Sequence, residues 1–457
     1  MTHHVILGAG PAGVIAAETI RKHAPHDEIT VVGEENEAPY SRMAIPYLLI
    51  GKVGEEGTHL RHTAGHFDKL NVKVLKGVWA KNVDAGKRHI ELSDGKSLSF
   101  DKLLIATGSR PNTPPIPGIN GPGVHSCWTL ADARAIADLA KPGAKVLQMG
   151  AGFIGCIIME ALQQRGVELS VVEMGDRMVP RMMGPMAGGM IKDWCEEKGV
   201  KVYTSAKVEA IERGGQSGEK SQGLLGKIAN AVGLGGGSAM PAAGGGMAVR
   251  LSTGETLAAD LVISATGVKP NVDFLENSGV RCMVGVLTDD RMQTNVEGIY
   301  AAGDCAEAFD KVSGKALVSA IQPNAAEQAR VAALNMVGQS ASLNGVTLIN
   351  VLDTLGLIST SFGNWEGVEG GQHVELTDKA ANKHLSLQFD GDVMVGCNSV
   401  GWTDHVGVMR GLVEGQVKLG EWKDKLMEDP TRLMDAYLAA AQGQGHWSGA
   451  NDERRRG

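Results

Sequence analysis

The sequence feature that most constrains the fold is a strand–turn–helix pattern at the start of the chain. The apolar run 5–7 indicates a short buried strand, residues 8–13 have the spacing Gly-x-Gly-x-x-Gly, and residues 14–21 follow as a helix. In this pattern Gly8 permits the tight turn, Gly10 lets the backbone approach a pyrophosphate, and Gly13 lets the helix pack against the strand. The phosphates then lie at the helix N-terminus, where unpaired N–H groups and the helix dipole favour negative charge.

An acidic residue completes this pattern. A second apolar run, 29–32, is followed by Glu34, which lies 21 residues past Gly13. A carboxylate at this place can accept hydrogen bonds from a ribose diol. Strand, glycines, helix, strand and acid in register predict a dinucleotide site, against the alternative of a glycine-rich turn without a ligand. The predicted binding residues are Gly8, Gly10, Pro11, Ala12, Gly13 and Glu34.

The same pattern occurs again in mid-chain. Residues 145–149 are the predicted strand, 156–165 the helix and 168–172 the next strand, which ends at an acid 18 residues past the last glycine. Two such sites suggest two nucleotides held face to face. The predicted binding residues of this second site are Gly150, Gly152, Phe153, Ile154, Gly155 and Glu173.

The charge at the second site favours NADH over NADPH. Glu173 would repel a 2′-phosphate and accept a hydrogen bond from a 2′-hydroxyl. Arg177 lies four residues further on and could neutralise a phosphate, so NADP(H) stays open as the less favoured partner.

Length and composition set further limits. A chain of 457 residues suggests about three domains. The net charge of -8 gives no indication of nucleic-acid binding, and the absence of a long apolar run predicts no spanning helix. The first residues enter a strand without a signal-peptide pattern, so a cytoplasmic protein is expected. The six cysteines have no Cys-x-x-Cys spacing, which argues against a metal site and a disulfide framework.

Further motifs carry a resemblance to a known family. They are the segment 39–47 (Pro-Tyr-Ser-Arg-Met-Ala-Ile-Pro-Tyr), the Ala-Thr-Gly turns at 106–108 and 265–267, and the segment 294–304, which ends in Gly-Asp. With the two glycine turns, they resemble the FAD-dependent pyridine nucleotide–disulfide oxidoreductase superfamily. The nearest branch contains NADH oxidases, coenzyme A–disulfide reductases, ferredoxin and rubredoxin reductases, and the nitrite reductase large subunit. The resemblance implies an α/β fold of two Rossmann-like domains, for FAD and NAD, and a C-terminal α+β interface domain.

The resemblance also implies roles for individual residues. Arg42 would help to position FAD, the backbone of Ala80 would contact adenine, and Asp304 would bind the ribityl chain. Tyr47 would lie at the flavin face, either as a packed aromatic or with a direct role, and no other catalytic residue is indicated. The remaining nucleotide contacts would come from Thr107, Gly108, Gly267 and Gly303.

Two departures from the family pattern concern the acceptor. Thiol-dependent relatives carry a redox cysteine near residues 39–49, yet no cysteine occurs between Met1 and Ser126. Ferredoxin-reductase-like relatives often carry a lysine where Tyr47 stands. Cys305 adjoins the expected flavin by motif, but a small buried hydrophobe is the commoner use of a free cysteine.

By this resemblance, the chain divides into three domains. Residues 1–112 and 272–344 would form the FAD-binding domain, 113–271 the NAD(H)-binding domain, and 345–457 a domain used for homodimerisation. The Gly-rich segment 214–246 resembles an insertion in the second domain. Its centre, 224–232, has helical spacing, and the segment is either a mobile surface loop or a tethered helix that docks a partner or a membrane surface.

The predicted function is an FAD-dependent NAD(P)H oxidoreductase. NADH would give a hydride to FAD, and the electrons would pass to an unidentified acceptor, which could be an iron–sulfur protein, a quinone or oxygen, but not a disulfide. One alternative is a flavoprotein subunit of a larger redox complex docked through 214–246. Another is a low-turnover signalling protein that binds flavin and NADH. Nucleic-acid binding is not expected in any of these cases.

Overall fold

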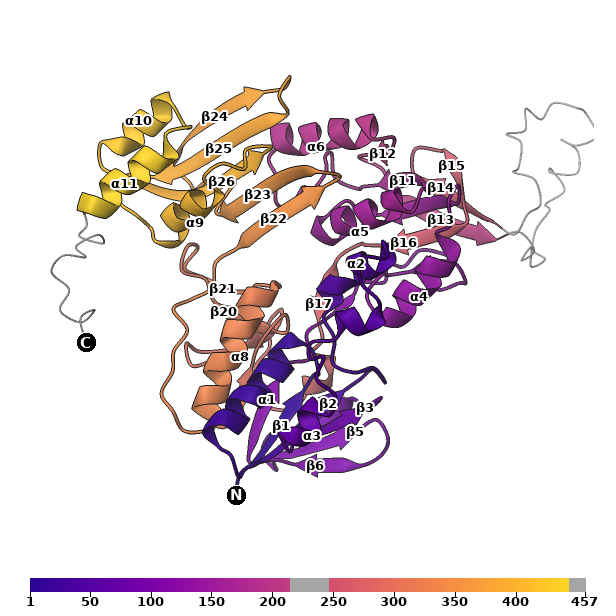
Figure 1. The fold of residues 1–457 in the computed structure, drawn as a ribbon, viewed down its shortest axis with the longest axis vertical. Helices are drawn as coiled ribbons and strands as arrows, with labels where there is room; N and C mark the ends of the chain where they lie inside the picture. The colour runs from indigo at the N-terminus through magenta and orange to yellow at the C-terminus, as the bar shows by residue number, and fades with distance from the viewer. Residues whose placement is uncertain (214–245, 444–457) are drawn as a thin grey trace, which may run out of the picture.

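The computed structural model describes residues 1–213 and 246–443, whose elements form three five-stranded sheets with helices packed around them (Figure 1). The predicted insertion 214–246 and its helical centre 224–232 lie outside the described residues, apart from Gly246. Among the helices of the described ranges, none has the length and apolar character needed to cross a bilayer.

The first sheet is parallel and joins strands that are far apart in the chain. Helices α1 (Pro11–His23) and α8 (Gln322–Met336) pack against each other beside it (Figure 1). Because β1, β7 and β19 are parallel, the glycine-containing turns that follow them meet at one edge of the sheet. The strand order is β19 (Ile299–Ala301), β7 (Lys102–Ile105), β1 (His3–Leu7), β2 (Glu28–Gly33) and β3 (Lys73–Lys76).

The second sheet repeats this arrangement and is also parallel. Its strand order is β12 (Lys201–Tyr203), β11 (Glu168–Val172), β10 (Lys145–Met149), β16 (Leu261–Ser264) and β9 (Val124–His125). The helices around it are α4 (Leu130–Leu139), α5 (Phe153–Gln164) and α6 (Pro185–Glu197). A short antiparallel pair, β8 (Ser109–Pro111) and β17 (Val268–Pro270), connects the first and second sheets.

The third sheet is antiparallel. Figure 1 shows its helices α9 (Val406–Glu414), α10 (Trp422–Glu428) and α11 (Leu433–Gly443) gathered at one side, while α5 and α6 contact β22 and β26 from the other. Its strand order is β22 (Ile349–Thr354), β23 (Leu357–Gly363), β26 (Val393–Val400), β25 (Lys383–Asp390) and β24 (Gln372–Asp378). Two parallel sheets and an antiparallel sheet with helices confirm the predicted fold class.

Small elements complete the described chain. Three-stranded sheets are formed by β4 (Ala80–Asp84), β5 (His89–Leu92) and β6 (Ser97–Ser99), by β13 (Val208–Arg213), β14 (Met247–Leu251) and β15 (Thr256–Ala259), and by β18 (Val286–Leu287), β20 (Ala306–Phe309) and β21 (Ala316–Val318). The short helices are α2 (Ile45–Leu49), α3 (His66–Lys69), η1 (Arg42–Ala44), η2 (Glu55–Thr58) and η3 (Asp273–Leu275).

The chain near its described end differs from the prediction. Periodicity predicts one helix over 406–419, whereas α9 ends at Glu414 and a separate helix, α10, begins at Trp422. Gly415 caps α9, and Gly420 has a φ of +54°, a conformation that glycine adopts at little cost. The apolar spacing therefore continues across a turn that interrupts the helix.

The segment after β2 packs against the helices of the second sheet. Ile45 and Leu49 of α2 are buried in the same core as residues of α4 and α5. Arg165 donates a hydrogen bond to the carbonyl oxygen of Leu49 at 2.5 Å, and Arg134 forms ion pairs with Glu37 and Glu55. This packing positions the residues around Arg42 between the first two sheets.

Candidate functional site

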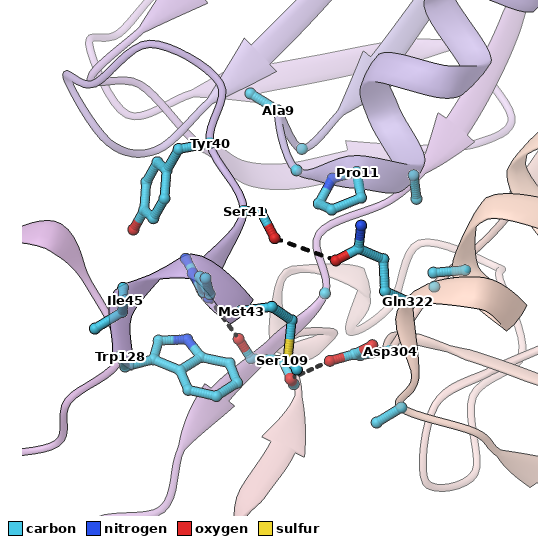
Figure 2. Close-up of a pocket in the computed structure, with 18 of the residues that line it drawn as sticks. Ala9, Pro11, Tyr40, Ser41, Met43, Ile45, Ser109, Trp128, Asp304 and Gln322 are labelled. Carbon is cyan, nitrogen blue, oxygen red and sulfur yellow. Dashed lines mark hydrogen bonds between the residues drawn. The ribbon is translucent and has the colours of Figure 1, made fainter. Parts of the chain in front are cut away.

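One cavity lies where the first sheet, the segment after β2 and the start of α5 meet (Figure 2). It brings together residues of both glycine turns, because Gly10 and Phe153 belong to different motifs and line the same space. The sequence-predicted residues that line it are Gly8, Gly10, Pro11, Ala12, Glu34, Arg42, Thr107, Gly108, Phe153, Ile154, Gly303 and Asp304.

The first glycine turn has room for an anion. Gly8 has a φ of +120°, and a Cβ there would overlap the carbonyl oxygen of Ala106. A Cβ on Gly13 would likewise overlap the carbonyl oxygen of Gly8, whereas Gly10 faces open space. Gly10 caps α1 without a side-chain hydrogen bond, so the first N–H groups of this helix stay available to a ligand. The turn fits a pyrophosphate at the helix N-terminus.

The second glycine turn has the same form and is braced by side chains. Gly152 faces open space and caps α5 without a side-chain hydrogen bond. The Gln148 amide donates to the carbonyl oxygen of Gly150 at 2.9 Å, and Glu173 accepts from the N–H of Ala151 at 2.7 Å. The arrangement holds the turn in shape and keeps the helix N-terminus open, as a dinucleotide requires.

Arg177 is occupied within its own loop. Its guanidinium donates to the carbonyl oxygens of Met183 at 2.9 Å and Pro180 at 3.4 Å, and it pairs with Asp176 at 2.7 Å. These contacts compete with any 2′-phosphate for the guanidinium. The geometry therefore strengthens the charge argument from Glu173 in favour of NADH.

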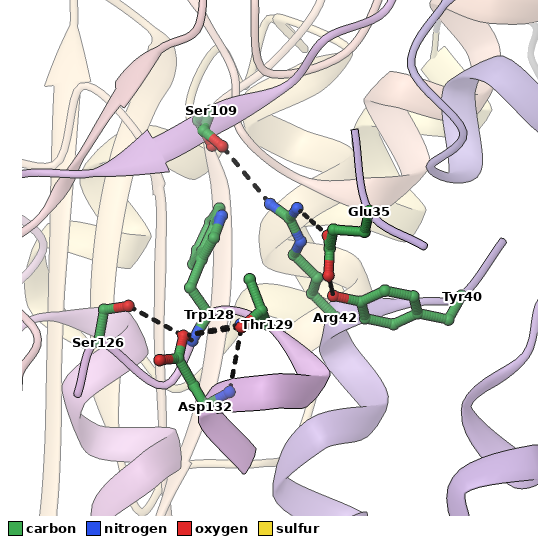
Figure 3. Close-up of polar contacts among 8 residues, drawn as sticks. All are labelled: Glu35, Tyr40, Arg42, Ser109, Ser126, Trp128, Thr129 and Asp132. Carbon is green, nitrogen blue, oxygen red and sulfur yellow. Dashed lines mark hydrogen bonds and ion pairs between the residues drawn. The ribbon is translucent and has the colours of Figure 1, made fainter. Parts of the chain in front are cut away.

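Arg42 lies at the centre of a polar network beside the cavity (Figure 3). It forms an ion pair with Glu35 at 2.8 Å, and the Tyr40 hydroxyl donates to the other oxygen of Glu35 at 2.7 Å. Arg42 also donates to the carbonyl oxygen of Ser109 at 3.5 Å, and the Ser109 hydroxyl donates to Asp304 at 2.8 Å. The network places a guanidinium and a carboxylate on one cavity wall.

Burial shifts the pKa values of two residues on this cavity wall. Desolvation raises the pKa of Asp304 above its ordinary value, although the hydrogen bond from Ser109 and the charge of Arg42 oppose the shift. Burial also raises the pKa of Tyr40. A partly buried carboxylate that accepts one side-chain hydrogen bond has lone pairs left for ligand hydroxyls, which fits the ribityl role implied by the resemblance.

Tyr47 lies outside the cavity lining, and its expected place at the flavin face stays a prediction. Its side chain is 53% exposed, and it is not among the lining residues. In the short helix α2, Ile45 and Leu49 are four residues apart and point into the core. Tyr47 lies between them in sequence and therefore points away, because side chains two residues apart occupy opposite faces of a helix.

Other predicted residues do not line the cavity. Gly13, Gly155 and Gly150 shape the turns from behind, and Ala80 is buried in β4. Cys305 is fully buried and bonds to the carbonyl oxygens of Ile105 and Ala302 at 3.4 Å, and burial raises its thiol pKa. It has the surroundings of a packing residue.

Several lining residues have no signal in the sequence. Glu35 follows the predicted ribose acid, yet nothing in the local pattern shows that it pairs with Arg42. Trp128 and Cys127 precede α4 and reach the cavity only because of how the two sheets are placed. Burial raises the pKa of the Cys127 thiol to about 12. Gln322, which accepts from Ser41 at 3.1 Å, begins α8 at the cavity (Figure 2).

Comparison with known proteins agrees with this geometry. The family profile described as pyridine nucleotide-disulphide oxidoreductase matches residues 2–333. The chain is 31% identical over 432 residues to the NADH-dependent phenylglyoxylate dehydrogenase subunit epsilon of Aromatoleum evansii, covering 94% of this chain and 95% of that one. It is also 31% identical over 347 residues to an NADH oxidase of Methanocaldococcus jannaschii, covering 74% of this chain and 70% of the other.

Solved structures have the same fold. An NAD-dependent persulfide reductase from A. fulgidus superposes with a TM-score of 0.79 at 26% identity, covering 92% of this chain and 78% of that one. A covalent putidaredoxin reductase–putidaredoxin complex superposes with a TM-score of 0.82 at 22% identity, covering 96% and 99% of the two chains. At these identities the second comparison concerns the fold alone.

Proposed function

We propose an electron-transfer role for this chain on the premise that it belongs to the pyridine nucleotide-disulphide oxidoreductase family. It is an FAD-dependent NADH oxidoreductase that passes electrons to an acceptor. The observation that carries the role is the shared cavity, in which Asp304 and the first glycine turn lie together with Phe153 and Ile154 of the second motif. Two nucleotides bound at these turns would meet there.

Different residues of the chain would bind different parts of FAD. We assign the pyrophosphate of FAD to the N-terminus of α1, its adenine ribose to Glu34 and its ribityl hydroxyls to Asp304. When bound, FAD supplies the hydride-accepting and electron-carrying chemistry. Phe153, Ile154 and the following turn of α5 give the cavity an apolar wall, which would exclude water from the reacting groups.

For the acceptor, we propose a one-electron iron–sulfur protein. Two features of this chain support that class over a disulfide: residues 1–126 contain no cysteine, and burial keeps Cys127 protonated at neutral pH. A rubredoxin reductase and a ferredoxin reductase are among the relatives, at 29% and 28% identity over about three quarters of this chain. These relatives support a carrier protein as the acceptor.

A second candidate is an FAD subunit of a larger assembly. The relative from Aromatoleum evansii is named as one subunit of a dehydrogenase, and the match covers nearly the full length of both chains. Such a subunit would exchange electrons with a neighbouring subunit of the same complex. In that case we propose that the segment 214–246 contributes to docking.

Acceptor assays test these proposals. Steady-state NADH oxidation with ferredoxin, rubredoxin, a soluble quinone, oxygen and a disulfide should give the highest kcat/KM with an iron–sulfur protein. Equal or faster turnover with the disulfide would overturn the proposed acceptor class. Little turnover with every acceptor would favour the signalling alternative.

Copurification from the native host, with the full chain and with a chain lacking 214–246, tests whether the protein is a subunit docked through this segment. Partners that are retained without the segment would exclude docking through it.

We also propose that the protein is a homodimer located in the cytoplasm. The family resemblance of residues 345–457 to an interface domain supports the dimer, and the use of NADH fits a cytoplasmic location. Sedimentation equilibrium of the purified holoprotein would test the dimer, and a monomer at micromolar concentration would contradict it.

A further inference from the structure

Trp128 contributes to the cavity from an unexpected direction. It stands just before α4, among the elements of the second sheet, yet it lines the cavity together with Ser109 and Asp304 from the first-sheet side (Figure 2). Neither glycine turn nor any other sequence motif contains it.

The backbone of Trp128 is held in place by a helix cap. The Asp132 carboxylate accepts hydrogen bonds from the N–H groups of Trp128 and Thr129, both at 3.0 Å, and from the hydroxyls of Ser126 and Thr129 at 3.0 and 3.1 Å (Figure 3). Burial raises the pKa of Asp132, but these hydrogen bonds outweigh it and hold the pKa below its ordinary value. The carboxylate is thus ionised at neutral pH, and Trp128 is presented by a rigid turn rather than a loose loop.

Arg42 stacks on Trp128 from the other side of the junction. The guanidinium carbon lies 4.9 Å from the centroid of the indole ring, which is a cation–π distance. The ion pair with Glu35 at 2.8 Å and the contact with the Ser109 carbonyl oxygen hold the guanidinium in this orientation. The stack therefore joins a residue of the segment after β2 to a residue that precedes α4.

The indole N–H of Trp128 is left without an acceptor. Within residues 1–213 and 246–443, no hydrogen bond is formed by its Nε1, whereas Nε1 of Trp194 donates to the Leu355 carbonyl oxygen at 3.1 Å. Trp128 is partly exposed, so its unpaired N–H is open to water or to a ligand in the cavity. An aromatic surface, a free donor and a fixed cation on one cavity wall are suited to a flat ligand that carries acceptor oxygens.

We propose that Trp128 is an FAD-binding residue that, with Arg42, clamps the cofactor at the junction of the first two sheets. Its ring packs against the cofactor and its Nε1–H donates to a cofactor oxygen. FAD binding would then fasten the elements around α4 to the first sheet. The proposal rests on the FAD dependence of the enzyme and not on the identity of the acceptor.

The test measures FAD affinity of the full-length apoprotein. Trp128→Phe keeps the ring and loses the donor, so we expect the Kd for FAD to rise about fivefold; Trp128→Ala loses both, and we expect a rise of about twentyfold or more. Trp194→Phe is the matched control, because it removes an indole N–H whose partner, Leu355, is outside the cavity. Its Kd should stay within twofold of the wild type.

Two further measurements separate binding from folding. The apoprotein melting temperature of Trp128→Phe should match the wild type, while the rise in that temperature on adding FAD should shrink. The quenching of tryptophan fluorescence by FAD should be smaller for Trp128→Phe than for Trp194→Phe. An FAD Kd for Trp128→Ala within twofold of the wild type would overturn the proposal. If the alanine variant does not fold, the overturning result is a Kd for Trp128→Phe within twofold of the wild type together with undiminished quenching.

Discussion

The carboxylate of Glu173 accepts a hydrogen bond from the N–H of Ala151 at 2.7 Å, and its other oxygen accepts from the N–H of Gly175 at 2.7 Å. The acid predicted to select NADH therefore also braces the turn that would bind its pyrophosphate. We expect Glu173→Gln to narrow the preference for NADH over NADPH about tenfold by removing charge repulsion, with one brace retained. Glu173→Ala should narrow it similarly and also slow reduction by NADH, because the brace is lost.

Anaerobic stopped-flow bleaching of the flavin by each nucleotide checks this expectation. Arg177→Ala is the matched control, and its nucleotide preference should stay within a few-fold of the wild type, since Met183, Pro180 and Asp176 already occupy the guanidinium. A wild type that prefers NADPH, or an Arg177→Ala variant that loses NADPH reactivity specifically, would mean that Arg177 outweighs Glu173.

Asp304 should lower the stability of the apoprotein and strengthen the binding of FAD. Because burial raises its pKa in the folded state, ionising it at neutral pH costs free energy of folding. We expect Asp304→Asn to raise the apoprotein melting temperature by a few degrees at pH 7, and the advantage to vanish at acid pH, where Asp304 is protonated. FAD binding should weaken about tenfold or more, because a charged acceptor for ribityl hydroxyls is lost.

Thermal unfolding with and without FAD tests Asp304, and the wild type should bind one non-covalent FAD per chain. Ser109→Ala serves as a comparison, because it removes the hydroxyl that donates to Asp304 at 2.8 Å but leaves the carboxylate. It should destabilise the apoprotein where Asp304→Asn stabilises it. An Asp304→Asn protein that binds FAD as tightly as the wild type would exclude the proposed ribityl contact.

The thiols should take no part in the redox cycle. Burial raises the pKa of Cys127 to about 12 and also raises that of Cys305, so neither supplies a thiolate at neutral pH. We expect reduction to stop at two electrons per FAD, with no long-wavelength thiolate band. Cys127→Ser and Cys305→Ser should each keep NADH-driven reduction within a few-fold of the wild type.

An anaerobic reductive titration provides the measurement for the thiols. The cavity-lining Cys127 is the sharper test, because a thiol role would act through a residue that reaches the cavity. Uptake of four electrons per FAD, lost in Cys127→Ser, would assign it a redox function. The same uptake lost in Cys305→Ser would assign that function to the buried thiol instead.

Because of His4, the free energy of unfolding should decrease when the pH falls slightly below neutral. His4 is fully buried in β1 and hydrogen-bonded to Asp27 at 3.1 Å, and desolvation lowers its pKa despite that partner. The unfolded chain therefore binds a proton more readily, and the free energy of unfolding should drop as the pH falls below about 6.5. His4→Gln should lose about 1 kcal/mol at pH 7 and flatten this dependence between pH 7 and pH 5.

Urea unfolding of the apoprotein across this pH range provides the check for His4. The exposed His89 of β5 is a suitable control site, and His89→Gln should leave the slope unchanged. A slope that persists in His4→Gln would assign the acid sensitivity to another group.

The local sequence pattern was sufficient to predict the conformation of the two glycine turns. Gly8 and Gly150 adopt positive φ next to carbonyl oxygens that a Cβ would overlap, and the flanking strands are buried as their apolar runs predict. Strand, turn and helix interact within about twenty residues of one another, so their constraints are visible in adjacent sequence. Glu173 was identified in the same way, as the acid that follows an apolar strand, whereas the role of Asp304 came from the family resemblance and not from local spacing.

Which residues form the cavity wall between these turns depends on the tertiary structure alone. Ser109 and Asp304 are 195 residues apart, and Arg42 meets Trp128 only because α2 packs on α4 and α5. The exposure of Tyr47 was likewise not predictable, because a helix of five residues is too short for periodicity to define its buried face, which the contacts of Ile45 and Leu49 determine. The sequence by itself therefore determined which nucleotides this chain is built to hold. The packing of two sheets, which depends on contacts distant in sequence, decided which side chains surround them.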